Sequence, residues 1–193
     1  MAKGIGRNGR KPALRLLNVL DLFAGCGALS AGLLQAGGFR IVAACEWNHF
    51  AAAAYTLNHP GTIVIEDDIT TEETKQAVCG AFANRRCDVV MGGPPCQCFS
   101  TSGKRDPDDP RLMLHEHFVD VTMRLNPSLV VIENVSDIMS MRFSDGTTVP
   151  DRIAVMLKSL GYAVGYRMLN AANFGVPQRR LRIFILGKVS PCA

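Results

Sequence analysis

The chain lacks the long hydrophobic segments of a membrane protein. None of its apolar runs reaches the 18 or more residues of a membrane span, and the basic N-terminus is not followed by the apolar core of a secretory signal. Internal repeats and low-complexity stretches are missing as well. With 193 residues, of which 48% are hydrophobic and 20% charged, the composition predicts one folded intracellular domain with a full core.

Patterns typical of metal sites are also scarce. The seven cysteines are odd in number and scattered; Cys96 and Cys98 form a close C-x-C pair, and the four histidines stand apart from it. A zinc site usually needs two ligand pairs with a spacing such as C-x-x-C. We therefore expect neither a metal site nor a disulfide framework, and the question becomes whether Cys96 or Cys98 attacks a substrate.

Acidic residues are missing from the first fifteen positions. These positions carry five basic residues, namely Lys3, Arg7, Arg10, Lys11 and Arg15, whereas the rest of the chain is close to neutral, with 16 basic and 17 acidic residues. We expect residues 1–15 to form a basic arm that precedes a domain at residues 16–193. A solvated tail and an arm that touches nucleic-acid phosphates both fit this pattern.

From about residue 16, short apolar runs rich in β-branched residues alternate with helix-like segments. Strands are expected at 16–23, 40–47, 62–68, 87–93, 128–135, 162–170 and 181–187, and helices at 28–37, 48–57, 71–83, 111–125 and 149–160. Thr70 or Thr71 is expected to cap the third helix. The alternation predicts a doubly wound α/β fold, with a mostly parallel sheet covered by helices on both faces and ligands at the carboxyl ends of the strands.

The segment "DLFAGCGALSAGL" predicts a strand, a glycine turn and the start of a helix. Gly25 and Gly27 let the backbone turn sharply beside a ligand, and Glu46 ends the next strand about twenty residues later, where it can accept hydrogen bonds from ribose hydroxyls. A nicotinamide cofactor also fits this turn. Trp47 can stack on adenine or belong to the core, and Asp68 can accept a hydrogen bond from the adenine amino group or cap the next helix.

Three later segments narrow the choice of cofactor. They are "GGPPCQCFS" (92–100), "ENV" (133–135) and "NFGVPQRRLRIFILG" (173–187). Together with the glycine turn, their order and spacing resemble the cytosine-C5 DNA methyltransferases over nearly the whole chain. The resemblance implies a Rossmann-like methyltransferase fold, S-adenosylmethionine as cofactor and duplex DNA as partner. It also implies a role in DNA methylation such as restriction-modification, with a cytoplasmic, nucleoid-associated location if the protein is prokaryotic.

The resemblance assigns roles to individual residues. It implies cofactor contacts at Phe23, Gly25, Gly27, Glu46, Trp47, Asp68, Ile69, Pro95 and Leu114. It implies catalytic roles for Cys96 as the nucleophile, Glu133 as the glutamate that engages the cytosine, and Arg180 and Arg182 as paired arginines behind the active site.

The reaction explains why these residue types are needed. Carbon C5 of cytosine is a poor nucleophile, so the Cys96 thiolate first adds at C6; C5 then takes the methyl group, and loss of the C5 proton expels the thiol. Glu133 can donate a proton at N3 if burial favours its protonated form, and Arg182 can hydrogen-bond to O2. The base must leave the duplex stack to be reached. We expect loop 99–111 to close over DNA, with an ordinary surface loop as the alternative.

The sequence departs from the family pattern at several places. Ala28 replaces the third glycine of the turn, which cofactor binding should tolerate if φ is negative there. Cys98 replaces a very small residue, and we expect either a tolerated substitution or a strained bridge to Cys96 under oxidation. The family's target-recognition region and its last two motifs do not follow Gly187.

These missing parts leave three readings open. As a methyltransferase, the piece should lack sequence specificity by itself, whether it is a fragment or one subunit of a split enzyme whose second subunit carries the recognition region. A catalytically inactive nucleic-acid-binding remnant and an RNA cytosine-C5 methyltransferase are the alternatives.

Overall fold

The computed structural model describes residues 15–95, 113–140, 142–143 and 145–189. The strands are β1 (Leu17–Leu22), β2 (Phe39–Cys45), β3 (Ile63–Ile65), β4 (Val89–Gly92), β5 (Leu129–Val135), β6 (Tyr162–Asn170) and β7 (Leu181–Val189). The helices are α1 (Ala28–Ala36), α2 (His49–Asn58), α3 (Glu72–Gly80), α4 (Leu114–Leu125) and α5 (Val149–Ser159), with short 3-10 helices η3 (Ser136–Met139) and η4 (Ala171–Phe174). Every strand and helix expected from the sequence is present.

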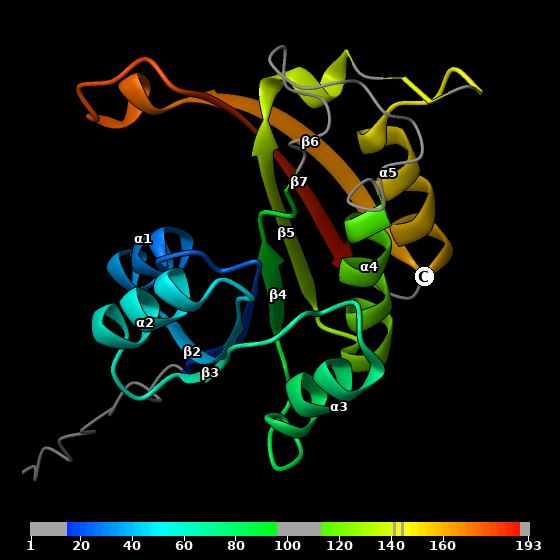
Figure 1. Ribbon diagram of the computed structural model, residues 1–193. Coiled ribbons are helices and arrows are strands. Elements are labelled where there is room, and N and C mark those ends of the chain that lie inside the picture. Colours follow the sequence, from blue (N-terminus) through cyan, green and yellow to red (C-terminus); the bar gives the residue numbers. More distant parts are fainter. Residues whose placement is uncertain (1–14, 96–112, 141, 144, 190–193) are drawn as a thin grey trace, which may run out of the picture.

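The seven strands form one sheet in the order β3-β2-β1-β4-β5-β7-β6 (Figure 1). Strands β1 to β5 pair in parallel, whereas β7 runs antiparallel between β5 and β6. The sheet is therefore mostly parallel, as expected. The insertion of β7 was not predicted from the sequence.

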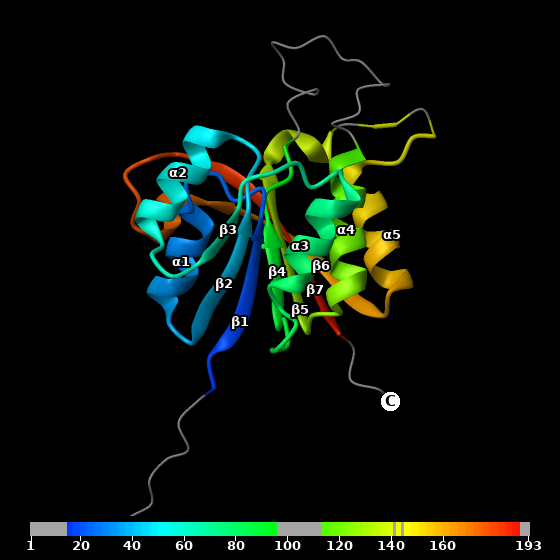
Figure 2. The ribbon, with the colours of Figure 1, turned by 60° about the horizontal axis from the view of Figure 1, so that its bottom comes forward.

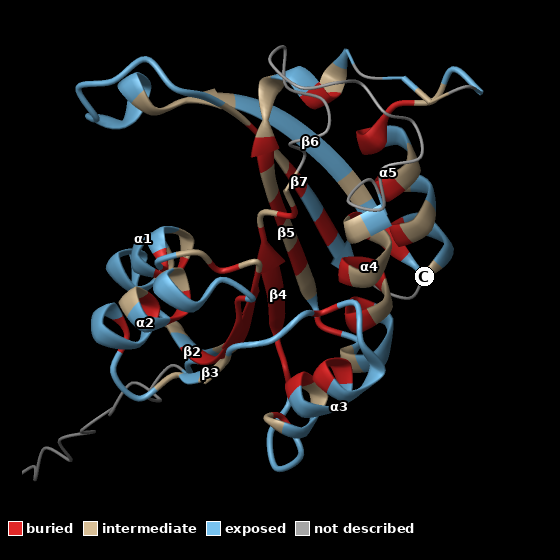
Figure 3. Ribbon diagram, in the orientation of Figure 1, coloured by how far each residue is buried: buried red, intermediate tan, exposed pale blue. Residues whose placement is uncertain are grey.

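Helices cover the sheet on both faces, which confirms the doubly wound fold (Figure 2). On one face, α1 packs on a cluster formed by Val19, Ile41, Val89 and Met91. On the other face, α3, α4 and α5 cover the larger core cluster, which contains Phe118 of α4 and Leu157 of α5. The central strands are buried along most of their length (Figure 3).

The α1 face of the sheet is less covered at β6 and β7. Alternate residues of β7 point to this face, and among them Leu186 is 45% exposed and Lys188 is exposed. Most of β6 is exposed as well (Figure 3). The helices within the described residues therefore leave an open sheet face on the α1 side of β6 and β7.

The start of the described chain lies at the amino ends of the parallel strands. Arg15 pairs with Asp88, whose carboxylate also accepts a hydrogen bond from the backbone N–H of Asn18 (2.9 Å). Arg15 is thus tied to the folded domain at the edge of the sheet opposite to the strands' carboxyl ends. Residues 1–14 lie outside the described residues, so the basic arm stays a prediction. None of the described helices is long and apolar enough to cross a membrane.

Two adjacent glycines end β4, and each allows a close approach. A Cβ at Gly92 would lie 2.1 Å from the carbonyl oxygen of Leu22 on the neighbouring strand β1. A Cβ at Gly93 would lie 3.1 Å from Oε2 of Glu133 on β5. The double glycine of "GGPP" thus lets β4 approach β1 and lets its loop approach Glu133.

We predict that Gly92→Ala lowers the free energy of unfolding by about 3 kcal/mol or more, because the new methyl group cannot fit beside backbone atoms. Gly32→Ala is the control, since no atom lies within 4 Å of the added Cβ. In α1 this change should be neutral or stabilise by up to about 1 kcal/mol. Chemical denaturation of both variants tests this, and equal effects would contradict it.

Candidate functional site

The glycine turn after β1 has the conformation that the sequence predicted. Gly25 has φ 56° and Gly27 has φ 91°, and Phe23, which has a side chain, also has a positive φ of 54°. Such a conformation typically costs a non-glycine residue about 1 to 3 kcal/mol, so the surrounding structure must impose it. Ala28 begins α1 and does not have positive φ, so the alanine at this position is tolerated.

Glu46 holds this turn in place. Its carboxylate is buried, with 8% of the residue exposed, and it accepts hydrogen bonds from the backbone N–H of Gly25 (2.8 Å) and of Asn48 (2.9 Å). The sequence predicted that Glu46 accepts hydrogen bonds from a ribose. A carboxylate that accepts two hydrogen bonds still has free acceptor sites. Ribose binding by Glu46 therefore stays a prediction, in addition to its observed role in holding the turn.

The next three candidate cofactor residues, Trp47, Asp68 and Ile69, differ in how far they are exposed. Trp47 is 74% exposed, which excludes the alternative that it belongs to the core. Asp68 is exposed and accepts a hydrogen bond from Thr70 N–H (2.9 Å), whereas Thr71 caps α3, so the capping alternative for Asp68 is wrong. Ile69 is only 4% exposed and packs in the main core cluster, and the cofactor contact expected of it stays a prediction.

A buried polar chain lies beneath the glycine turn. The Ser30 hydroxyl lies 2.6 Å from Oδ2 of Asp21 and 2.6 Å from the Tyr55 hydroxyl, and all three residues are at most 1% exposed. Burial raises the pKa of the Asp21 carboxyl to about 7; the hydrogen bond from Ser30 lowers it, and the charge of Glu46 raises it further. The chain joins β1, α1 and α2 directly below the turn.

His59 supports the same turn from the end of α2, a role that sequence reasoning missed. Its Nε2 lies 2.9 Å from the carbonyl oxygen of Gly27, and its ring packs against Tyr55 with centroids 4.5 Å apart. A Cβ at Gly27 would lie 2.1 Å from Nε2. Gly27 is therefore required for its positive φ and for the space that His59 occupies.

The loop after β4 is fixed by Asn134 of the "ENV" segment. The Asn134 side chain is buried and its Nδ2 donates to the carbonyl oxygen of Pro94 (2.8 Å). Pro94 is buried and Pro95 half-buried. The expected nucleophile Cys96, its neighbour Cys98 and the loop at 99–111 lie outside the described residues. Asn134 thus anchors the chain two residues before Cys96, and the motif alone did not reveal this.

Glu133 and Arg182 lie together at the carboxyl end of β5. Nε of Arg182 lies 3.0 Å from Oε1 of Glu133, with side chains 23% and 28% exposed. Glu133 is therefore ion-paired and half-buried, and the proton donation at N3 that was expected of it stays a prediction. Arg180 is exposed and forms no ion pair within the described part of the chain, and its catalytic role beside Arg182 stays a prediction.

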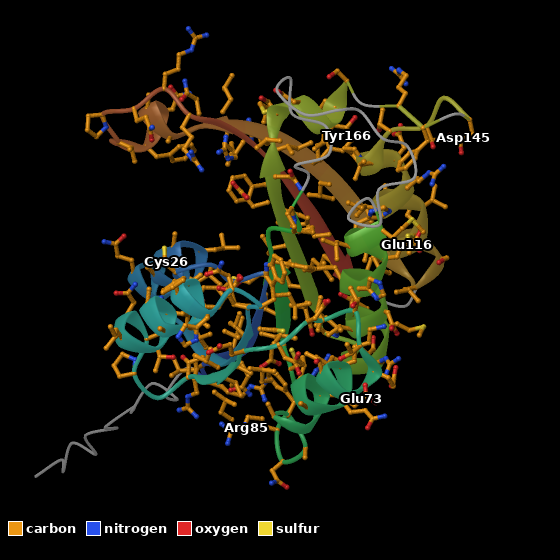
Figure 4. The ribbon with its side chains drawn as sticks, in the orientation of Figure 1. Cys26, Glu73, Arg85, Glu116, Asp145 and Tyr166 are labelled. Atoms are coloured by element: carbon orange, nitrogen blue, oxygen red, sulfur yellow. The ribbon has the colours of Figure 1, made fainter. Side chains whose placement is uncertain are left out.

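The last candidate, Leu114, is the half-buried first residue of α4. The start of α4 lies toward the carboxyl ends of the parallel strands, in the helix layer opposite to α1 and α2 (Figure 1). Cys26, in the glycine turn, is exposed and lies on the α1 side (Figure 4). The described candidate site residues thus lie at the end of the sheet where the parallel strands have their carboxyl ends, apart from the buried side chain of Ile69.

Comparisons with known proteins identify sequences and structures to which this chain is similar. The model for C-5 cytosine-specific DNA methylases matches residues 17–191. The type II methyltransferase M.DdeI of Desulfomicrobium norvegicum is 40% identical over 171 residues, which are 89% of this chain and 40% of that protein. M.AquIA of Picosynechococcus sp., also a type II methyltransferase, is 40% identical over 178 residues, or 88% of this chain and 71% of that protein.

A solved E. coli structure, described as a DNA modification methyltransferase encoded within a prophage, is similar with a TM-score of 0.75 and 30% identity. The similarity covers 90% of this chain and 47% of that chain. The chain therefore spans less than half the length of this protein and of M.DdeI.

The buried Asp21 predicts a pH dependence of stability. Its folded-state pKa of about 7 lies above the ordinary value of 3.8, so between these values the folded chain binds a proton that the unfolded chain does not. Asp21 should therefore lower the free energy of unfolding as pH rises through this range, by up to about 4 kcal/mol. In Asp21→Asn, denaturation measured across the range should show a flatter pH profile.

Asp145→Asn is the control for that profile. Asp145 is exposed, and a hydrogen bond from the Thr147 hydroxyl lowers its pKa to about 2, outside the range concerned. Its replacement should leave the slope unchanged. If Asp21→Asn keeps the wild-type slope, the role assigned to Asp21 is wrong.

Proposed function

The chain belongs to the C-5 cytosine-specific DNA methylase family, and from this premise we propose that it transfers a methyl group from S-adenosylmethionine to C5 of cytosine in duplex DNA. The pairing of Glu133 with Arg182 beside the anchored Pro94 loop carries this proposal. It supports a site in which the Glu133 carboxylate, the Arg182 guanidinium and the Cys96 thiol, two residues after Pro94, face one base. A nicotinamide oxidoreductase would leave these groups without a purpose.

The cofactor site fits the residues present. Glu46 has acceptor capacity left for ribose hydroxyls, Trp47 exposes its indole for stacking on a base, and a Cβ at Gly25 would meet no atom within 4 Å, so space is open beside the turn. Asp68 is exposed at the end of the next strand and can accept from an amino group. S-adenosylmethionine, when bound, supplies a methyl group on a positively charged sulfur.

The protein groups act on the cytosine ring in turn. The Cys96 thiolate adds to C6 and raises the electron density at C5; after C5 is methylated, a base removes the C5 proton and the C–S bond breaks, which restores the thiolate. A low pKa favours the thiolate, and sulfur is also a good leaving group. Pro94, held by Asn134, fixes the start of the loop that presents this sulfur.

Glu133 and Arg182 hold the base while this occurs. In its protonated form, Glu133 would donate its proton at N3 and so relieve the charge that builds on the ring as sulfur adds. Nε of Arg182 pairs with Glu133, and its Nη1 donates a hydrogen bond to the carbonyl oxygen of Leu181. Its Nη2 is therefore left to donate to O2 of the cytosine. Arg180 is exposed and keeps its proposed catalytic role beside Arg182. A base held here must leave the duplex.

Target recognition is proposed to need a further part, in the same or a separate chain. The relatives M.DdeI and the prophage protein are more than twice as long as the matched region. Leu186, which is exposed on the open α1-side face of β7 opposite Val131 of β5, offers apolar surface on which such a part can pack. A DNA substrate also implies an intracellular location.

Labelled methyl transfer from S-adenosylmethionine to duplex DNA tests the proposal. The chain is assayed alone and together with any recognition polypeptide that is encoded beside it. We expect transfer by the complemented wild type and a loss of about a thousandfold or more in Cys96→Ala, because the covalent route is removed. Cys79→Ala is the matched control, since Cys79 is a half-buried thiol of α3 away from the site, and it should keep full activity.

The two alternatives give different results in the same assay. A catalytically inactive remnant would show no more transfer in the complemented wild type than in Cys96→Ala, which would refute the catalytic claim. An RNA methyltransferase would transfer methyl groups to tRNA in preference to duplex DNA when both compete, which would refute the DNA substrate.

A further inference from the structure

Charge is distributed very unevenly toward the C-terminus. Residues 152–193 carry seven basic residues and no acidic one. Five of the seven belong to β6, β7 or the connection between them, namely Arg167, Arg179, Arg180, Arg182 and Lys188. The labelled carboxylates Glu116 and Asp145 lie on the α4 and α5 side of the molecule, away from the β6–β7 connection (Figure 4). The domain as a whole is nearly neutral, so this basic segment is not apparent from its net charge.

The β6–β7 hairpin extends beyond the end of β5 toward the side of α1 and α2 (Figure 1). Its residues 172–181 are all exposed. Oδ1 of Asn170 accepts hydrogen bonds from the backbone N–H of Ala172 (3.3 Å) and of Arg180 (3.1 Å), so both sides of the hairpin end are tied together. The arginines therefore stand on a braced projection beside the site.

Strand register places one of these arginines on the same face as the catalytic carboxylate. Glu133 of β5 is opposite Phe184 of β7, and Phe184 is opposite Arg167 of β6. Directly paired residues point to the same face, so Glu133, Phe184 and Arg167 form a row across three strands. Two strand spacings separate the ends of this row by roughly 10 Å. Arg182 lies two residues along β7 from Phe184 and shares the face.

Arg167 is also available for a ligand. It is exposed, and within the described part of the chain it forms no ion pair, whereas Arg182 is neutralised by Glu133. Its structural alternative is protection of a sheet edge, because β6 is the last strand and charged side chains on edge strands prevent pairing with other chains. Protection of the edge explains why β6 carries a charged residue. It does not explain why Arg167 lies in the same row as Glu133.

We propose that Arg167 binds a backbone phosphate of the DNA strand that carries the target cytosine. The inference rests on the proposed function, because it takes Glu133 as the partner of the base. A nucleotide whose base engages Glu133 has its own phosphates within one nucleotide's length of that carboxylate. Arg167 lies in the same row, at the outer edge of the sheet, and a guanidinium matches the geometry of a phosphate. Its contact fixes the sugar-phosphate chain while Glu133 and Arg182 hold the base.

The salt dependence of DNA binding tests this proposal. A fluorescent mixed-sequence duplex is titrated with wild type, Arg167→Gln and Lys188→Gln, each in the form used for methyl transfer. Lys188 is a matched control because it is an exposed cation on the same face of β7, opposite Leu129 at the amino end of β5. Arg167→Gln should reduce the slope of log K against log salt by about one phosphate contact, and Lys188→Gln should not.

The outcomes separate the two proposals. Unchanged slope in Arg167→Gln, equal changes in both variants, or no duplex binding by wild type would overturn the role of Arg167. Increased self-association of Arg167→Gln with an unchanged slope would assign the residue to edge protection instead. Cofactor binding measured by calorimetry should be the same in all three proteins. If methyl transfer fails in wild type while the slope still falls in Arg167→Gln, the proposed function is wrong and the phosphate contact stands.

Discussion

The register of β7 between β5 and β6 is the constraint on which the site depends. Because β7 runs antiparallel, its first residues return to the carboxyl end of β5, and Arg182 arrives opposite Val135 with Glu133 two residues away on the same face. A slip of one residue would turn Arg182 to the α5 side and bring Ile183 to the site. Burial of Ile183 and Ile185 against the other face opposes that slip, so core packing fixes the positions of the polar groups.

The opposite side of the site depends on buried polar groups instead of strand register. Glu46 joins the glycine turn to the end of β2, His59 supports it from α2, and Asp21 with Ser30 and Tyr55 lies beneath it. Each of these side chains has a hydrogen-bond partner, although Nδ1 of His59 is buried without one. The result is a rigid turn with open space at Gly25, next to the exposed Trp47. The proposed cofactor contacts thus depend on buried hydrogen bonds, whereas the proposed contacts to the base depend on strand register.

The sequence predicted the strands and helices well, because each is marked by local periodicity and by turn residues. It did not predict the insertion of β7, since pairing between β5 and β7 joins residues about fifty positions apart. Site residues recognised by motif came together at the sheet edge, yet their contacts did not follow from the motif. Ile69 is core, Glu133 is ion-paired, and His59 and Asn134 emerged only from packing. Local patterns specify elements, whereas burial and pairing between distant segments decide contacts.

We propose that this chain presents Cys96 to a cytosine ring held by Glu133 and Arg182. The most direct test of this proposal is a duplex that contains 5-fluorocytosine, incubated with the complemented protein and S-adenosylmethionine, followed by peptide mapping of the adduct. Fluorine at C5 cannot leave as a proton does, so the account predicts a stable covalent complex attached at Cys96. Attachment at Cys98, or no covalent complex from a preparation that binds both DNA and cofactor, would contradict it.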